Sequence, residues 1–198
     1  MTALLPRLRW PDVGFAIKPV NLWIEVGAGS FEHAEAMARA NPAIGLIACE
    51  VFENGIASLL SRIAPGDTDP ASVILPANLR LYPDDARALL RSLPDRALGQ
   101  LFLMFPDPWP KARHAKRRFV HPDMIYEIAR VMQSGAEWRI ASDDPTYQQW
   151  VSAVFAAQHD FIMTQQTTIR PDDWPATRYE AKAIRAGRQP YYWIFRRV

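Results

Sequence analysis

The chain has 198 residues, of which 49% are hydrophobic and 22% are charged, and its formal net charge is +2. This length and balance favour one globular domain over 1–198, in which 1–20 form a short N-terminal extension. The small net charge excludes a uniformly basic nucleic-acid-binding protein, so any site for a polyanion must come from local clustering of cations.

No apolar run approaches the length that crosses a bilayer, and no apolar stretch with a small-residue cleavage site follows Arg7 and Arg9. The single cysteine, Cys49, has no partner for an internal disulfide and suits a reducing compartment. No other His or Cys pairs with His114 at metal-ligand spacing. We therefore expect a cytoplasmic protein, monomeric or homodimeric, without a membrane segment or a metal ion.

Apolar runs and helical patterns alternate along the chain. Leu22 to Val26 is a short apolar run that ends at a glycine and predicts a strand, and the Ala-rich segment from Phe31 to Ala40 predicts a helix. The same signals predict strands at 44–49, 78–82, 101–105, 137–142, 161–163 and 191–195, and helices near 56–63, 84–93, 122–132 and 144–158. This order is typical of an α/β fold with a doubly wound, mostly parallel seven-stranded sheet.

Ligands of such sheets bind outside the carboxyl ends of the strands, so the residues after each strand are the ones that matter. Gly27 and Gly29 follow the first strand and let the chain turn tightly around a ligand. Glu50 follows the second strand, where an acid can accept hydrogen bonds from a ribose diol, and Asp84 and Asp85 follow the third, where an acid can meet an adenine amino group. These positions predict a pocket for an adenosine-containing cofactor.

NAD and S-adenosylmethionine both fit such a pocket. The dinucleotide fingerprint requires a third glycine at position 32, but this chain has Glu32 there, and Glu25 flanks the same turn. Acids disfavour a pyrophosphate and suit the sulfonium and ammonium groups of S-adenosylmethionine. The residues favour the methyl donor, while a glycine turn by itself also fits any α/β domain.

The fourth strand ends in Phe105-Pro106-Asp107-Pro108-Trp109-Pro110-Lys111. Three prolines stiffen the backbone from which Asp107 and Trp109 project, which suits a site that holds a flat base in one orientation. Five cations follow within eight residues: Lys111, Arg113, Lys116, Arg117 and Arg118. The segment predicts contact with a phosphate backbone, and a proline-rich surface turn with a solvated charge run is the structural alternative.

Two later groups have a structural and a functional interpretation each. Asp143 follows the fifth strand and either holds a substrate base or caps the next helix. Thr177 and Glu180 have the spacing of a capping box, and their hydroxyl and carboxylate also suit a guanine edge.

With these motifs the chain resembles the bacterial tRNA (guanine-N7-)-methyltransferase family. The resemblance rests on Phe105 to Lys111 with the following Arg113-His114-Ala115-Lys116-Arg117-Arg118, and on Thr177-Arg178-Tyr179-Glu180 followed by Gly187. It implies a class I S-adenosylmethionine-dependent methyltransferase that methylates N7 of a tRNA guanosine in the variable loop. The cofactor residues that it implies are Glu25, Gly27, Gly29, Glu50, Asp85 and Asp107, with Asp107 at the catalytic position. The residues that it implies for the tRNA guanosine are Lys111, Arg113, His114, Asp143, Thr177, Arg178, Tyr179 and Glu180.

The first loop departs from the family's Gly-x-Gly-x-Gly pattern because Phe31 replaces the third glycine. A ring at this position could crowd the methionine end of the cofactor. Three alternatives therefore stay open: a methyltransferase that acts on another base or on protein, a noncatalytic RNA-binding protein in which Phe31 blocks the donor, and a nicotinamide oxidoreductase.

Overall fold

The computed structural model describes residues 14–15, 18–64 and 75–198, so most of the expected N-terminal extension, 1–20, lies outside the described residues. The strands are β1 Leu22–Val26, β2 Gly45–Cys49, β3 Leu79–Tyr82, β4 Leu98–Met104, β5 Met132–Ser142, β6 Phe161–Thr167 and β7 Tyr191–Arg197. The helices are α1 Glu32–Ala40, α2 Glu53–Ile63, α3 Ala86–Ser92, α4 Pro122–Val131, α5 Pro145–Ala156, α6 Arg178–Arg185 and the short 3-10 helix η2 Ala112–Arg117. The order of strands and helices agrees with the sequence prediction, except that α6 and η2 were not predicted.

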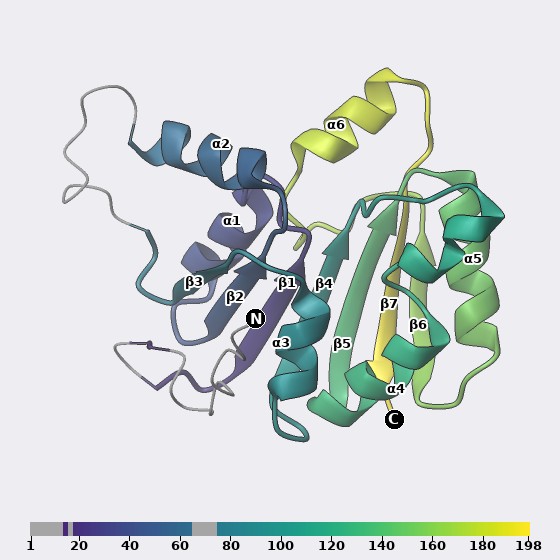
Figure 1. Cartoon of the computed structure of the whole chain (residues 1–198), viewed down its shortest axis with the longest axis horizontal. Coiled ribbons are helices and arrows are strands. Elements are labelled where there is room, and N and C mark those ends of the chain that lie inside the picture. The colour runs from purple at the N-terminus through teal and green to yellow at the C-terminus, as the bar shows by residue number, and fades with distance from the viewer. Residues whose placement is uncertain (1–13, 16–17, 65–74) are drawn as a thin grey trace, which may run out of the picture.

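Within the described residues, seven strands form one sheet in the order β3-β2-β1-β4-β5-β7-β6 (Figure 1). Strands β1 to β5 are mutually parallel, and β7 runs antiparallel between β5 and β6. Each parallel connection passes through a helix, because two parallel strands can only be joined by a crossover. The predicted doubly wound, mostly parallel sheet is confirmed.

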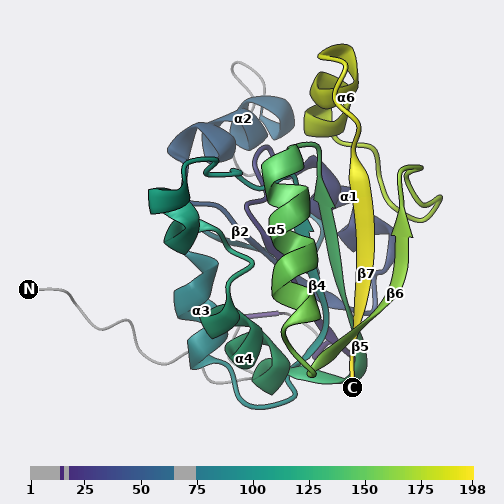
Figure 2. The same cartoon turned by 90° about the vertical axis from the view of Figure 1, so that its right-hand side faces the viewer.

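Helices cover both faces of the sheet, as the continuously apolar strands require. One core layer packs α3, α4 and α5 against alternate residues such as Leu22, Ile24 and Trp138. The other layer packs α1 and α2 against the intervening residues, including Leu46 and Phe102. Figure 2 shows α3, α4 and α5 on one side of the sheet and α1 on the other.

The carboxyl ends of the parallel strands meet at one edge of the sheet. The end of β6 and the start of β7 reach the same edge because β7 is antiparallel, and the long connection between them carries α6 above it (Figure 1). The fold therefore brings α6 to the edge where β1 to β4 end. No helix in the described part of the chain is both long and apolar enough to span a bilayer.

Candidate functional site

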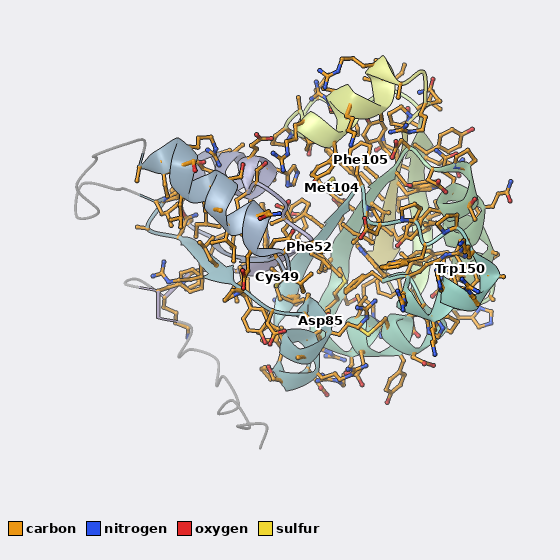
Figure 3. The ribbon with its side chains drawn as sticks, turned by 45° about the horizontal axis from the view of Figure 1, so that its top comes forward. Cys49, Phe52, Asp85, Met104, Phe105 and Trp150 are labelled. Atoms are coloured by element: carbon orange, nitrogen blue, oxygen red, sulfur yellow. The ribbon has the colours of Figure 1, made fainter. Side chains whose placement is uncertain are left out.

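A cavity of about 570 Å³ opens at this edge, over the ends of β1, β2, β3 and β4. It is lined by Gly27, Glu50, Asp85 and Asp107, four of the six residues predicted for the cofactor, together with Lys116, Arg117 and Tyr179. Cys49, Phe52 and Asp85 lie on one side of it, with Phe105 on the other (Figure 3). The structure thus brings together segments that are far apart in the sequence.

The glycine turn after β1 is held by Glu50. Gly27 and Gly29 have φ angles of 69° and 56°, in the left-handed region that favours glycine. The Glu50 carboxylate is buried and accepts hydrogen bonds from the backbone N–H of Gly29 at 2.7 Å and of Phe52 at 2.8 Å. From the sequence, Glu50 was predicted only to contact a ligand. In the structure it also links the end of β2 to the glycine turn through these hydrogen bonds.

Gly55 on α2 is a second support of the turn that sequence reasoning missed. A Cβ atom built at Gly55 would lie 2.3 Å from the carbonyl oxygen of Gly29, so any side chain there would push the helix off the turn. No spacing signal in the sequence marks this glycine, because the close approach involves backbone atoms of another element.

Phe31 adopts the left-handed conformation that its position requires, with a φ angle of 64°. Its ring is fully buried in the core layer of α1, among neighbours such as Ala34 and Leu46. It lines neither the large cavity nor the small one beside it. The structure therefore gives no support to the hypothesis that this ring crowds or blocks the cofactor.

Glu25, at the end of β1, is buried beside the glycine turn, and its carboxylate contacts Nδ1 of His33 on α1 at 2.8 Å. It lines a small cavity of about 10 Å³ that is separate from the large one. Tyr179 of α6 lines both cavities, and its ring lies across the turn, since a Cβ atom built at Gly29 would be 2.9 Å from its Cε2. Tyr179 thus lines both cavities beside the glycine turn.

Asp85 caps α3, because its side chain accepts a hydrogen bond from the backbone N–H of Arg87 at 2.9 Å. The same carboxylate pairs with the Arg87 guanidinium at 3.1 Å while it lines the large cavity. Arg87 also donates to the carbonyl of Arg117 at 2.9 Å, and so ties the third strand's loop to the basic segment.

The segment around Asp107 is held in an unusual backbone conformation. Phe105 and Trp109 have φ angles of 52° and 44°, in a region that L-residues adopt only when their surroundings impose it. Asp107 itself is exposed at the cavity, and its side chain forms no hydrogen bond or ion pair with any residue that the structure describes. The strained frame thus presents a free carboxylate to the cavity.

The basic run does not act as one patch. Lys111, Arg113, Lys116 and Arg117 are exposed, and Lys116 and Arg117 line the cavity. The prediction that Arg118 belongs to this phosphate-binding run is wrong: it is 5% exposed and donates to the carbonyls of Pro108 at 3.1 Å and Trp109 at 3.0 Å. Its guanidinium is satisfied by the backbone of the Asp107 segment, which leaves four exposed cations for a polyanion.

Trp109 also packs against the basic run. The Arg117 guanidinium lies 4.6 Å from the centre of its ring, and the His114 ring meets it edge-on at 5.7 Å. His114 is half-buried in this contact and accepts a hydrogen bond from Arg113 Nε at 3.3 Å. The structure thus joins Trp109 and His114, which the sequence does not link to each other.

Asp143 does not line the large cavity, and its carboxylate pairs with Arg188 at 2.5 Å. It also does not cap the following helix, because Asp144 performs that role by accepting from the backbone N–H of Tyr147. The capping alternative for Asp143 is therefore wrong, and its contact with a substrate base stays a prediction.

Thr177 caps α6 by accepting from the backbone N–H of Glu180 at 3.1 Å, which confirms half of the predicted capping box. The other half is wrong, because the Glu180 carboxylate turns inward. Its Oε1 accepts from the hydroxyl of Tyr192 at 2.7 Å and from Arg170 Nε at 3.1 Å, and the residue is 7% exposed. Sequence reasoning missed Arg170 and Tyr192, since nothing in their spacing links them to Glu180.

Cys49 lines the cavity but is 1% exposed. Burial, followed by the nearby carboxylates of Glu25, Asp85 and Glu50, raises the pKa of its thiol well above the usual value. The thiol is therefore protonated at neutral pH and unsuited to act as a nucleophile. In the described residues, no group of three or more His, Cys, Asp or Glu side chains is arranged to hold a metal ion.

Comparison with known proteins identifies relatives over nearly the whole chain. Residues 20–193 match a family model described as "Putative methyltransferase". A tRNA (guanine-N(7)-)-methyltransferase from Granulibacter bethesdensis is 60% identical over 96% of this chain and 84% of its own length. The protein of the same name from Paramagnetospirillum magneticum is 45% identical over 98% of this chain and 84% of its own length.

Solved structures show the same fold at low identity. The 16S rRNA methyltransferase KamB has a TM-score of 0.62 and 17% identity over 91% of this chain and 89% of its own. A 16S rRNA (adenine(1408)-N(1))-methyltransferase from Catenulisporales acidiphilia, solved with its cosubstrate SAM, has a TM-score of 0.59 and 16% identity over 91% of this chain and 87% of its own. These similarities establish the class I Rossmann-like methyltransferase architecture of the sheet and its helices.

Proposed function

Because this chain belongs to the tRNA (guanine-N(7)-)-methyltransferase family, we propose that it transfers a methyl group from S-adenosylmethionine to N7 of a guanosine in the variable loop of tRNA. The observation that carries this proposal is the free Asp107 carboxylate on a rigid loop, between a cavity with acidic walls and exposed cations. A cytoplasmic location and a monomeric or homodimeric state stay predictions.

The cavity fits the adenosine part of the cofactor. Its volume of about 570 Å³ lies within the range of small-molecule sites, and the carboxylates of Glu50 and Asp85 line it, where they suit ribose hydroxyls and the adenine amino group. The bound cofactor supplies an activated methyl group on a cationic sulfur. Glu25 would provide a buried carboxylate beside the glycine turn for the cationic end.

Guanine N7 carries a free lone pair at neutral pH, so the chain has no proton to remove before attack and needs no covalent nucleophile. Catalysis therefore rests on proximity and in-line alignment of the base with the methyl group. Asp107 suits this role because its oxygens are free to accept hydrogen bonds from the N–H groups of the guanine edge. The left-handed residues on either side, Phe105 and Trp109, keep the carboxylate in one place.

The RNA is held through its phosphates by four exposed cations, Lys111, Arg113, Lys116 and Arg117, of which the last two line the cavity. Taking the guanosine out of its tertiary contacts costs a few kcal/mol, which these contacts offset. Asp143, Thr177 and Glu180 are proposed to contact the guanosine because membership of the family implies that role for them.

The noncatalytic alternative depended on Phe31 blocking the methyl donor. The ring lies in the core and lines neither cavity, so the structure gives no support to that alternative. The nicotinamide alternative has no support either, because Glu32 and the buried Glu25 leave the turn without the charge that a pyrophosphate needs.

To test this function, the protein is incubated with unmodified tRNA and S-adenosylmethionine, the RNA is digested, and 7-methylguanosine is measured by mass spectrometry. Asp107→Ala is compared with Asp123→Ala, which removes an exposed carboxylate from α4, outside the cavity. We expect product from the wild type and from Asp123→Ala, and none from Asp107→Ala with an unchanged melting temperature. Absence of product from the wild type, while a known family member works in parallel, would refute the function, and normal turnover of Asp107→Ala would refute the role of that carboxylate.

A further inference from the structure

Helix α6 has one basic face. Of the residues on this face, only Arg178 is among those predicted to bind tRNA. Arg178, Lys182 and Arg185 stand at i, i+4 and i+7, which places them within an arc of about 60° on the helix surface. The buried residues of the helix, Glu180 and Ala183, lie on the opposite side, turned toward the sheet. The three cations therefore point away from the protein together.

These cations are not neutralised by neighbouring acids. All three are exposed, and none forms an ion pair with any residue in the part of the chain that the structure describes. The only acid on the helix, Glu180, faces inward to Arg170. In a protein whose net charge is only +2, this face is a local concentration of positive charge.

The basic face stands beside the proposed catalytic cavity. Helix α6 lies above the edge at which the parallel strands end (Figure 1), and Tyr179, next to Arg178, lines the cavity. Lys116 and Arg117 of the basic run line the same cavity. Cations from two separate segments thus lie in or next to the elements that line this cavity.

We propose that the face formed by Arg178, Lys182 and Arg185 is a second phosphate-binding surface, which holds the RNA backbone on the α6 side of the cavity. From Arg178 to Arg185 the helix rises about 10 Å, so its three cations can reach successive phosphates of one strand. The identity of the RNA rests on the proposed function. The surface itself rests on the helix geometry and its unpaired charge.

Stabilisation of the helix by its own cations does not account for this arrangement. Lys182 and Arg185 lie in the last turn, where positive charge favours the helix macrodipole. Arg178 is the first residue of the helix, where positive charge opposes the macrodipole. A face that runs the whole length of the helix points to an external polyanion.

The test compares Lys182→Gln/Arg185→Gln with Arg91→Gln. Arg91 is an exposed cation in the last turn of α3, at the far end of a helix that begins at the cavity, so it controls for loss of charge at a helix C-terminus. The affinity for unmodified tRNA is measured by fluorescence titration across about 50 to 200 mM salt, with melting temperatures and steady-state kinetics of methyl transfer.

In a plot of log affinity for tRNA against log salt concentration, we expect the slope of the double variant to be shallower by about 2. This is about one unit for each cation that no longer contacts a phosphate. The wild type then loses about tenfold more affinity than the double variant over that fourfold range of salt. The KM for tRNA rises, while kcat at saturating tRNA and the affinity for S-adenosylmethionine stay at the wild-type values. Arg91→Gln behaves as the wild type.

An unchanged salt slope and tRNA KM in the double variant would overturn the proposal, and so would an equal effect in Arg91→Gln. Failure of the proposed function is distinguishable: the wild type would bind tRNA and form no 7-methylguanosine, while the difference in salt slope would still decide whether α6 contacts RNA. A wild type that does not bind tRNA would overturn both.

Discussion

Arg118→Met tests whether the end of the basic run binds RNA or supports the catalytic loop. In the structure the guanidinium donates to the carbonyls of Pro108 and Trp109 and lies 4.7 Å from the centre of the Trp150 ring. Hydrogen bonds from a charged donor contribute about 1.5–3 kcal/mol each, and methionine replaces only the apolar stem. We expect the free energy of unfolding to fall by about 3 kcal/mol, which lowers the melting temperature of a chain of this size by about 6–12 °C.

The matched control is Arg113→Met, which removes an exposed cation from the same run. Both variants are measured by thermal unfolding, by steady-state kinetics and by the salt dependence of tRNA binding. We expect Arg118→Met to lose stability and kcat with an unchanged salt slope, because the loop that carries Asp107 loosens. Arg113→Met keeps its stability and loses about one unit of salt slope. The reasoning fails if Arg118→Met melts as the wild type and weakens tRNA binding as Arg113→Met does.

Three further predictions concern buried side chains. Phe31→Gly relieves the left-handed backbone but leaves a cavity where a buried ring was, so the free energy of unfolding in urea should fall by about 2–4 kcal/mol. Tighter cofactor binding without that loss of stability would mean that the ring does obstruct the cofactor cavity. The Cys49 thiol, whose pKa is raised by burial, should resist a thiol reagent at about pH 8 until the chain is unfolded, and rapid labelling of the folded protein would contradict this. Burial and the hydrogen bond to Glu180 raise the pKa of Tyr192, so its neutral phenol stabilises the fold below about pH 10 and loses that contribution as pH rises further. Tyr192→Phe should therefore be less stable than the wild type near neutrality, and its free energy of unfolding should depend less on pH above about pH 10. Parallel pH profiles of stability in the two proteins would count against the contact.

The fold could be predicted from the sequence because its parallel strands are buried on both faces. Leu101 to Phe105 is a continuous apolar run and Leu22 to Val26 is apolar except for Glu25, and such runs are recognisable without knowledge of their neighbours. The residues after them converge in space because parallel strands all end at one edge, which is why Gly27 and Asp85 were assigned to one pocket. The extension of β6 to Thr167 was missed because residues 162–166 of this edge strand are exposed and carry no apolar alternation.

The roles of individual charged residues were harder to predict than their grouping. Arg117 and Arg118 are neighbours of the same type, yet one lines the cavity and the other is buried against backbone carbonyls. The carbonyls of Pro108 and Trp109 accept hydrogen bonds from Arg118, in a loop where Phe105 and Trp109 take left-handed conformations, and the sequence carries no signal for these contacts. A count of cations therefore overestimates the charge available to a polyanion.

The motif Thr177 to Glu180 shows the same division on a helix. Successive residues of a helix point about 100° apart, so one motif must serve two surroundings. Tyr179 turns to the cavity and the glycine turn, while Glu180 turns to Tyr192 and Arg170 and fastens α6 to β7. Since Tyr179 and the cations of α6 depend on where the helix sits, removal of the Glu180 carboxylate displaces them as well. Two causes, a shift of the helix and loss of the proposed contact with the guanosine, therefore predict lost activity in Glu180→Ala. Tyr192→Phe separates them, because it loosens the same contact and leaves the carboxylate in place.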